Sequence, residues 1–290
     1  MKRIIYGILF FKAIIISLLP RRIHALIAWI LAIIFFDIFR IRRQIILSNI
    51  AIAYPQLSLK ERIRMGRASV ASQGQIIIEY FLMMAYRPSW FKKYYSFEGL
   101  EHLDEAYRQG KGVFLLTLHI GNGDFACAGL AQKGYSVNLI TKKAKQGWLN
   151  DIWFGVRTRL GTRLIAHEKS NSEILKALKR NEAVIWVMDQ YMGPPSGIKT
   201  TFFGKETGTA RGMAVFVERT QVPVIPCYNF RRADGSFHLV AEKPLLYESR
   251  EDHEATILYL TQMYNDKLEE FVRKIPSQWM WIHRRWKKFG

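Results

Sequence analysis

Leu115-Leu116-Thr117-Leu118-His119-Ile120-Gly121-Asn122-Gly123-Asp124 is the stretch that decides the fold of this chain. The apolar run over residues 113–118 predicts a buried strand that ends at His119. Gly121 and Gly123 permit a tight turn, after which Asp124 opens a segment of small residues typical of a helix. On one continuous helix His119 and Asp124 would lie about 140° apart, so their side chains can meet only across a turn.

A histidine followed five residues later by an aspartate, at the carboxyl end of a strand, suits acid–base chemistry. An imidazole oriented by a carboxylate is a competent general base for a hydroxyl, and open α/β sheets bind ligands at this end of their strands. The spacing alone also fits a structural histidine beside an aspartate at a helix N-terminus. The HX4D pattern of His119 and Asp124 therefore gives a candidate site and leaves the structural alternative open.

The composition of the chain restricts its partners. The 290 residues are 49% apolar, which is enough for a sizeable core, and carry a formal net charge of +19. Such a charge calls for a partner of opposite sign, for which nucleic acid, an anionic membrane face and an acidic protein all qualify. The two cysteines, Cys127 and Cys227, lie in apolar surroundings without metal-ligand spacing, so we expect a reducing compartment and no disulfide framework.

Residues 1–39 are expected to form a membrane anchor. Two apolar runs, over residues 4–19 and 23–39, are bracketed by arginines that would face anionic lipid. Neither run reaches the ~20 uninterrupted apolar residues of an unambiguous spanning helix, so we expect one spanning or deeply embedded helix followed by an interfacial one. A secretory signal peptide would need a small-residue cleavage site, which does not follow here. A buried helical hairpin of a soluble core is the remaining alternative.

Residues 40–96 show a helical pattern and are expected to pack on the catalytic domain. Ser58 and Glu61 resemble a capping box at the start of a long helix. Glu79 lies in an apolar stretch of that helix, where we interpret it as a carboxylate with a structural partner and not as a catalyst.

Residues 97–290 alternate between strand and helix patterns, which predicts an α/β domain with a mixed, partly parallel sheet flanked by helices. Further strands are expected over residues 135–140, 183–188 and 222–228. Asp189 follows one of these strands as His119 follows its own. Both side chains are therefore expected at one shared site.

Three further stretches are notable for their basic residues or their glycines. A helix over residues 148–160 places Arg157 and Arg159 on opposite sides of its apolar face, so that one of them can point inward. The glycine-rich residues 193–212 suit a phosphate cradle, although such a stretch alone is weak evidence. The tail over residues 278–288 mixes aromatic and basic side chains, as segments that bind single-stranded nucleic acid or a lipid interface do.

Taken together, these stretches resemble the lipid A biosynthesis lauroyl/myristoyl acyltransferases, a branch of the glycerolipid acyltransferase superfamily. The order and spacing of the matching segments over nearly the whole chain carry the resemblance, because each motif alone is weak. The segments are Leu19-Pro20, Arg42-Arg43, residues 48–55, Phe97-Glu98-Gly99-Leu100, residues 119–124, residues 157–161, Met188-Asp189-Gln190 and residues 276–287. One difference is Asp124, where the lipid A enzymes typically carry glutamate and the wider superfamily carries aspartate.

The resemblance implies acyl transfer from an acyl carrier protein thioester to a hydroxyl of a lipid A precursor, an anionic glycolipid, at the cytoplasmic face of the bacterial inner membrane. His119 would be the general base, oriented by Asp124, and Arg157 would stabilise negative charge at the reacting centre. Asp189 matches a functional position of the family without an assigned role. Substrate contacts are expected from Arg159, Gly121, Asn122, Arg284 and Arg285. Because a thioester is already an activated donor, no metal or cofactor is expected.

Other functions stay open on the sequence alone. The acceptor could instead be a lysophospholipid, an ornithine lipid or a glycosylated lipid. A membrane-anchored nucleic-acid-binding protein is a more distant alternative: the basic residues are spread along the chain without an RNA- or DNA-binding motif, so no nucleic acid partner is expected. A serine hydrolase is excluded because no Gly-x-Ser-x-Gly elbow is present.

Overall fold

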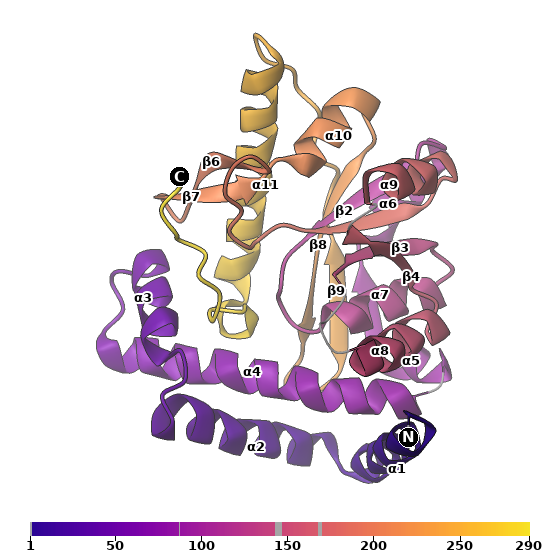
Figure 1. Cartoon of the computed structure of the whole chain (residues 1–290), viewed down its shortest axis with the longest axis vertical. Helices are drawn as coiled ribbons and strands as arrows, with labels where there is room; N and C mark the ends of the chain where they lie inside the picture. The colour runs from indigo at the N-terminus through magenta and orange to yellow at the C-terminus, as the bar shows by residue number, and fades with distance from the viewer. Residues whose placement is uncertain (1, 87, 143–146, 168–169) are drawn as a thin grey trace.

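The computed structural model describes residues 2–86, 88–142, 147–167 and 170–290, and its centre is a seven-stranded sheet in the order β1-β9-β8-β2-β5-β3-β4 (Figure 1). These strands are β1 (Tyr95–Glu98), β2 (Val113–Thr117), β3 (Val137–Thr141), β4 (Arg163–Ala166), β5 (Ala183–Val187), β8 (Val224–Arg231) and β9 (Phe237–Ala241). Each neighbouring pair is parallel except β8 and β9, which are antiparallel. The predicted mixed, partly parallel sheet is confirmed.

The register of the central strands places two polar side chains at one edge of the sheet. β2 lies between β5 and β8, and Leu115 is opposite Ile185 on one side and Ile225 on the other. Apolar residues fill both strands because parallel strands of this kind are buried on both faces. Thr117 is opposite Val187, so β2 and β5 end side by side. The polar residues that follow them therefore leave the sheet together, as the sequence predicts.

Helices cover both faces of the sheet. Phe114 and Leu116 belong to one core with α9, α10 and α11, whereas Val113 and Leu115 belong to a second core with α5 to α8. This alternation follows from the two-residue period of a strand. The bounds are α5 (Pro88–Tyr94), α6 (Leu100–Arg108), α7 (Gly123–Gln132), α8 (Gly147–Arg159), α9 (Ser170–Lys179), α10 (Gly212–Thr220) and α11 (His253–Lys274).

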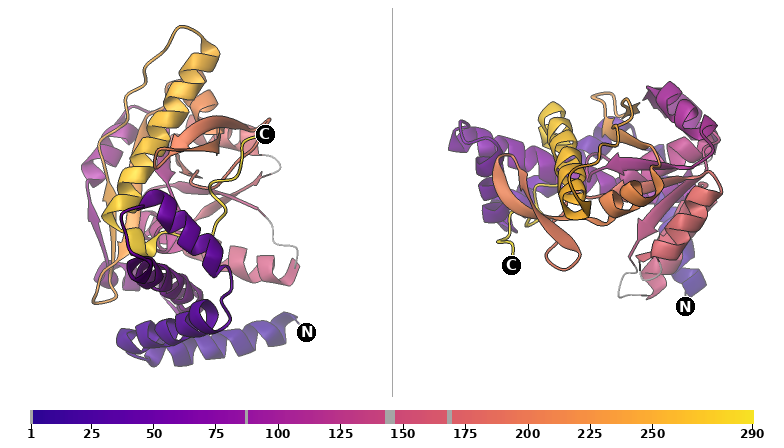
Figure 2. Two further views of the ribbon diagram at one scale, coloured as in Figure 1. Left: turned by 90° about the vertical axis from the view of Figure 1, so that its left-hand side faces the viewer. Right: turned by 90° about the horizontal axis from the view of Figure 1, so that it is seen from above.

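The N-terminal helices form a further layer below the sheet (Figures 1 and 2). They are α1 (Lys2–Leu18), α2 (Arg21–Ala32), the π-helical turn η1 (Ile33–Ile38), α3 (Arg43–Ala53) and α4 (Leu59–Ala85). Small side chains such as Ala13 and Ala28 are buried under α1 and α2, whose outer faces expose large apolar side chains. Leu18 is 79% exposed and Phe11 is 64% exposed.

Within the described residues, none of the helices taken singly has both the length and the apolar character needed to cross a bilayer. Tyr6–Leu18 and Arg21–Ile38 satisfy that requirement only as a pair, with a bend of 113° between them.

The long helix α4 begins and is anchored as the sequence indicates. The hydroxyl of Ser58 accepts from the backbone N–H of Glu61, and the carboxylate of Glu61 accepts from the backbone N–H of Ser58, which confirms the capping box. Farther along α4, the buried Glu79 accepts from Arg231 at 2.6 Å and from Asn122 at 2.9 Å. Glu79 is thus a partnered structural carboxylate.

Two stretches that the sequence offers as candidate ligand-binding segments also have structural roles. The glycine-rich residues fold into a hairpin of β6 (Gly197–Phe202) and β7 (Lys205–Ala210). A Cβ at Gly197 or Gly208 would lie 2.0 or 2.2 Å from the carbonyl oxygen of Met192, so close backbone packing requires these glycines. The aromatic tail runs inward, and Trp279 and Trp281 are buried in the core instead of facing lipid or nucleic acid.

Candidate active site

His119 is held at the end of β2 by a carboxylate from the end of β5. Its Nδ1 lies 2.7 Å from Oδ1 of Asp189, and its backbone N–H donates to Oδ2 of the same side chain at 3.0 Å. The indole N–H of Trp279 also donates to that Oδ2, at 2.7 Å. The two oxygens of Asp189 are therefore fully used in fixing one imidazole. This contact follows directly from the parallel register of β2 and β5.

Asp189 and His119 each stabilise the charged form of the other. Burial alone would raise the pKa of Asp189, but His119 and the hydrogen bonds from His119 and Trp279 hold that pKa well below its usual range. Burial would lower the pKa of His119, but the Asp189 carboxylate outweighs it and raises that pKa. Because Asp189 is only 1% exposed and stays ionised, Nδ1 of His119 carries the proton. The lone pair of the neutral imidazole is then on Nε2.

The Nε2 side of His119 faces other polar side chains. The side-chain amide nitrogen of Gln190 lies 3.3 Å from Nε2 of His119 and 3.0 Å from Nε2 of His283. The two imidazole rings are 5.4 Å apart. Burial, His119 and the nearby Arg42 lower the pKa of His283, which therefore stays neutral at pH 7. The amide of Gln190 thus lies between the two imidazoles, in the place where a substrate hydroxyl would have to meet His119.

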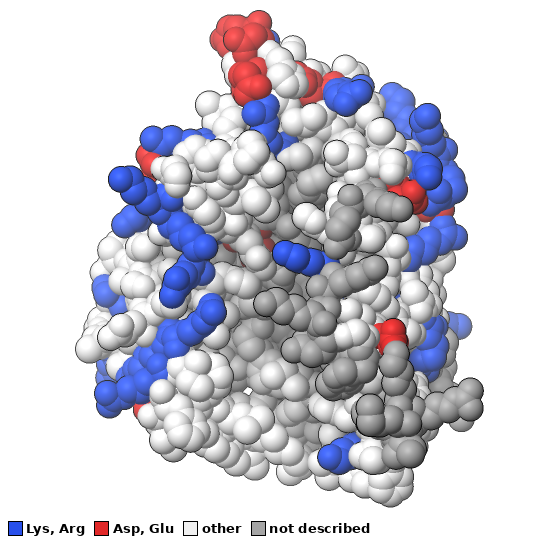
Figure 3. All heavy atoms as spheres, in the orientation of Figure 1, with Lys and Arg blue, Asp and Glu red and all other residues white. Residues whose placement is uncertain are grey.

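A basic cleft adjoins this arrangement. It has a volume of about 370 Å³ and is lined by Arg42, Gln190, Tyr191, His283, Arg284 and Lys287. Basic side chains also gather on the surface over α3 and the end of the chain (Figure 3). The basic cleft joins residues from the start of α3, the loop after β5 and the C-terminal tail. Its charge suits a phosphate or another anionic group beside His119.

The prediction that Asp124 orients His119 is wrong. Oδ1 of Asp124 accepts from Nε of Arg157 at 2.6 Å, and Oδ2 accepts from Nη2 of Arg157 at 3.0 Å and from the hydroxyl of Tyr80. Asn122 caps α7 through the backbone N–H groups of Asp124 and Phe125, which fixes how the helix begins. The side chain of Asp124 is thereby committed to α8 and α4, and Asp189 takes the role assigned to it.

Arg157 and Arg159 also differ from expectation. Arg157 is buried and pairs with Asp124, not with Asp189, and it donates to Thr141 at 3.0 Å. Arg159 donates to the carbonyl oxygens of Met83, Met84 and Tyr86, which are the free acceptors at the end of α4. Arg157 fastens α7 to α8, and Arg159 caps a helix instead of binding a headgroup.

We expect Arg159→Ala to lower the free energy of unfolding by about 1 kcal/mol, because hydrogen bonds at an exposed helix end contribute modestly. The Michaelis constant for the acceptor should stay unchanged, because the guanidinium serves the backbone of α4. Denaturant unfolding and steady-state kinetics on the same variant check both parts. A raised Michaelis constant with unchanged stability would restore the headgroup role.

Of the four remaining residues predicted to bind substrate, one lies at the basic cleft. Arg284 is exposed there. Arg285 is fully buried, with donors to Gln190 O, Gly208 O, Thr209 Oγ1 and Asn265 Oδ1, and burial lowers its pKa to about 10. Gly121 has a φ of 57° and packs against the backbone of Asn229, so it shapes the turn. Asn122 is the helix cap.

Several site residues were not predicted from the sequence. Gln190, His283, Trp279 and Arg42 come from distant segments; Gln190 adjoins Asp189 and His283 adjoins Arg284, both of which were named from the sequence. Across the described parts of the chain, no group of three or more His, Cys, Asp or Glu residues is placed to hold a metal ion. Cys127 and Cys227 are buried, and burial raises the pKa of both thiols, which makes them poor nucleophiles.

A carboxylate-held histidine at the strand ends of an α/β fold has the geometry that acid–base activation of a hydroxyl requires. A sequence model of the family described as bacterial lipid A biosynthesis acyltransferase matches residues 2–288. The chain belongs to this family, and it is therefore an acyltransferase.

Individual relatives agree with the family assignment. The chain is 25% identical over 253 residues to a lipid A biosynthesis lauroyltransferase of Escherichia coli, covering 85% of this chain and 79% of the relative. It is 26% identical to a palmitoleoyltransferase of the same organism, covering 85% and 79%, and 24% identical to a myristoyltransferase, covering 81% and 72%. A crystal structure of a 1-acyl-sn-glycerophosphate acyltransferase from Thermotoga maritima aligns with a TM-score of 0.39 and 13% identity, covering 92% of this chain and 100% of that one.

Proposed function

We propose that this acyltransferase moves a fatty acyl chain from the thioester of an acyl carrier protein to a hydroxyl of a lipid A precursor. Membership of the family supports acyl transfer in lipid A biosynthesis. The observation that carries the mechanism is the imidazole of His119, held at Nδ1 by a buried aspartate and presenting Nε2 beside a basic cleft. That arrangement activates a hydroxyl next to an anionic group.

The proposed reaction begins at Nε2 of His119. The acceptor hydroxyl takes the place of the Gln190 amide at Nε2 of His119 and gives its proton to that nitrogen. The alkoxide oxygen then forms a bond to the thioester carbonyl carbon, and Asp189 stabilises the imidazolium that results. When the tetrahedral intermediate collapses, the carbon–sulfur bond breaks and the thiolate receives the proton from His119. The products are an ester and the free thiol of the carrier, and His119 is neutral again.

The charge of the protein suits both proposed substrates. An acidic carrier protein and a phosphorylated glycolipid are each attracted to a chain with a formal net charge of +19. The basic cleft is the place for a phosphate of the glycolipid, since Arg42, Arg284 and Lys287 converge there next to His283. Arg42 follows Ile41, and Phe39 precedes it by three residues; both apolar side chains are exposed, so the basic cleft lies beside apolar surface.

We expect the double substitution Arg284→Ala/Lys287→Ala to raise the Michaelis constant for a phosphorylated acceptor roughly tenfold and to leave kcat nearly unchanged, because a headgroup contact contributes equally to the ground state and the transition state. Acceptor is varied at saturating acyl donor. The matched control is Arg108→Ala/Lys111→Ala, which removes two exposed cations at and just after the end of α6, neither of which lines the basic cleft. If only the donor's Michaelis constant rises, the basic cleft binds the carrier and not the acceptor.

The proposed site of action is the cytoplasmic face of the bacterial inner membrane, with residues 1–39 attaching the protein to the bilayer. The supporting observation is the apolar outer face of α1 and α2, which includes Phe11, Leu18 and Leu26. Since the two helices are bent sharply against each other, we infer that they lie in the interface with their apolar faces in lipid.

We expect Phe11→Asp/Leu18→Asp to abolish flotation with vesicles of anionic phospholipid, because burying two carboxylates in lipid is unfavourable. These side chains point away from α4, so the fold should persist, as circular dichroism can check. The control is Leu246→Asp, which changes an equally exposed leucine far from the N-terminal helices. Equal flotation of all three proteins would remove residues 1–39 from membrane attachment.

Mass spectrometry of lipids from a strain lacking this protein tests the proposed reaction in the cell. The lipid A fraction should lose one fatty acyl chain, and the wild-type gene should restore it where His119→Ala does not. The same spectrum gives the chain length. Loss of a chain from another lipid, with lipid A unchanged, would contradict the proposed acceptor.

A further inference from the structure

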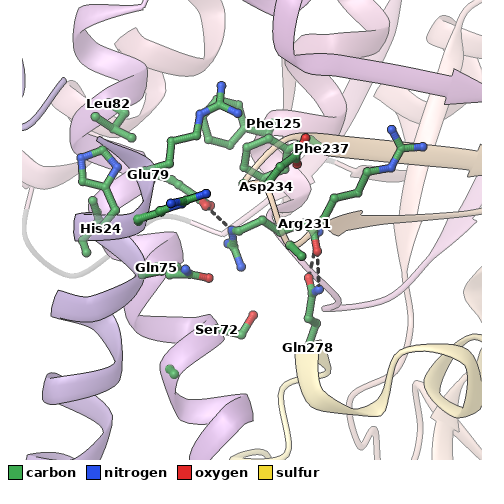
Figure 4. A pocket seen from close by; sticks show the side chains of 18 of the residues that line it. His24, Ser72, Gln75, Glu79, Leu82, Phe125, Arg231, Asp234, Phe237 and Gln278 are labelled. Carbon is green, nitrogen blue, oxygen red and sulfur yellow. Dashed lines mark hydrogen bonds and ion pairs between the residues drawn. The ribbon is translucent and has the colours of Figure 1, made fainter. Parts of the chain in front are cut away.

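A second, larger hollow lies at the seam between the N-terminal helices and the sheet, and His119 is not among its lining residues (Figure 4). Its volume is about 830 Å³, within the range of cavities that hold small-molecule ligands. We call it the seam hollow. Its wall is formed by α2, by α4 and by the turn that joins β8 to β9. Among the described residues, four arginines and two carboxylates line it, together with aromatic rings such as Trp29 and Trp90.

Three buried polar atoms of the seam hollow lack a hydrogen-bond partner within the described part of the protein. They are Nη2 of Arg231, Oγ of Ser72 and Nη2 of Arg21. Arg231 is 9% exposed and Ser72 is 5% exposed, so the surrounding protein shields both side chains from bulk solvent. The view in Figure 4 shows Ser72, Gln75 and Arg231 arranged around one space. Leaving such groups unpaired is unfavourable, which indicates a ligand that accepts hydrogen bonds there.

The carboxylate nearest to Arg231 cannot serve as that acceptor. Oε1 of Glu79 accepts from Nε of Arg231, and Oε2 accepts from Asn122. Nη2 of Arg231 therefore points past Glu79 into the seam hollow. Since the unpaired groups are two guanidinium donors and a hydroxyl, the complementary ligand is an anion with several oxygens.

The rest of the lining favours an amphiphile over a free ion. Trp29, Trp90 and Leu82 give the seam hollow an apolar side, and its volume far exceeds what one phosphate fills. Arg21, Ala25 and Trp29 of α2 line it, and the outer faces of α1 and α2 expose apolar side chains. We propose that the seam hollow binds the phosphate headgroup of an anionic phospholipid, with Arg21, Ser72 and Arg231 as its ligands.

The seam hollow is separate from the site of acyl transfer. Gln278 lines the seam hollow, whereas His283 lines the basic cleft beside His119. Between them the chain runs through Trp279, which forms a β-bridge with Ile120. Among the described residues, none lines both spaces. Binding in the seam hollow therefore does not depend on the proposed reaction at His119.

A bound headgroup would join the N-terminal helices to the sheet. Arg21 is the first residue of α2 and lies against the β8–β9 turn, where a Cβ at Gly235 would approach its Cδ to 2.8 Å. Arg231 ends β8 on the other side of the seam hollow. A phosphate held by both guanidinium groups links the two elements across the seam. Binding should therefore raise the unfolding temperature of the whole chain.

The test uses the full-length protein in neutral detergent micelles and measures binding by calorimetry together with the thermal unfolding midpoint. The probes are a short-chain phosphatidylglycerol, the phosphatidylcholine with the same chains, and inorganic phosphate. Phosphatidylglycerol should bind saturably and raise the midpoint, and the other two should bind at least tenfold more weakly. Arg21→Gln and Ser72→Leu should each weaken phosphatidylglycerol binding roughly tenfold or more, since each removes a donor to a charged group.

The matched control is Lys12→Gln, which removes one exposed cation from α1 and should bind phosphatidylglycerol as the wild type does. Equal affinity for phosphatidylcholine, or an equal loss in Lys12→Gln, would show unspecific attraction and overturn the proposal. Equal affinity for inorganic phosphate would assign the seam hollow to a free anion and overturn the lipid. Absence of saturable binding would leave it filled by water alone, which also contradicts the inference.

Discussion

His119→Ala is expected to lower kcat for acyl transfer by about 10²–10⁴-fold while the protein stays folded, because the general base is lost and β2 remains buried. The ring is part-exposed at the end of the strand, so its removal leaves the core intact. The matched control is His283→Gln. Its ring centroid lies 5.4 Å from that of His119, but its side-chain hydrogen bond within the described residues is with Gln190 and not with a carboxylate. If His283→Gln lost more of kcat than His119→Ala, His283 and not His119 would be the general base.

The carboxylate that holds His119 gives the same prediction a pH signature. Because Asp189 raises the pKa of His119, the active neutral form is reached only above the ordinary range of histidine. The acid limb of kcat/KM should therefore lie above pH 6.5, the ordinary pKa of a histidine. Asp189→Asn should lower kcat and move this limb to lower pH, whereas Asp124→Asn should move it less, because Asp124 contributes less than Asp189 to the raised pKa of His119. A shift in the Asp124 variant alone would restore the partner predicted from the sequence.

Arg157→Ala is expected to lower the free energy of unfolding by about 3–5 kcal/mol, because it leaves the carboxylate of Asp124 buried without its cation. The two side chains are 8% and 4% exposed, and the pair connects α7 to α8. Denaturant unfolding measures the change. The control is Arg108→Ala, whose partner Glu105 and own side chain are both largely exposed, and which should change stability by less than about 1 kcal/mol.

The same variant separates two accounts of Arg157. If it anchors helices, activity at low temperature should fall only as far as the folded fraction does. A variant of normal stability that has lost turnover would instead support a guanidinium that stabilises charge in the transition state. Asp124→Asn/Arg157→Met removes both charges and should recover part of the lost stability, because no uncompensated charge stays buried.

The apolar strand patterns correctly predicted the two strands whose ends carry His119 and Asp189. The runs around Leu115 and Ile185 are apolar because both strands are buried on both faces, and this signal is local. Their parallel pairing then placed His119 and Asp189 at one edge, as expected from the sequence. The sequence could not indicate which carboxylate reaches the imidazole. That choice depends on how Asn122 caps α7 and directs Asp124 toward Arg157.

The burial of the C-terminal tail, in contrast, could not be predicted from the sequence. A run with Trp279, Trp281 and Arg285 has the composition of an exposed binding segment, yet the structure buries all three. Their partners lie far away in the sequence: Trp279 donates to Asp189, and Arg285 donates to a carbonyl of the β6–β7 hairpin. Hydrogen bonds between segments so far apart leave no periodic pattern in the sequence. His283 lies in the site for the same reason, because the buried residues on either side of it in the tail fix its position.

The most direct test of the account is a transfer assay with the purified full-length protein, an acyl carrier protein loaded with a radiolabelled acyl chain, and a lipid A precursor in mixed micelles. The account predicts that the label passes to the glycolipid as an ester, that one carrier thiol is released for each ester formed, and that His119→Ala loses both signals together. Release of thiol without labelled glycolipid, or transfer undiminished in His119→Ala, would contradict it.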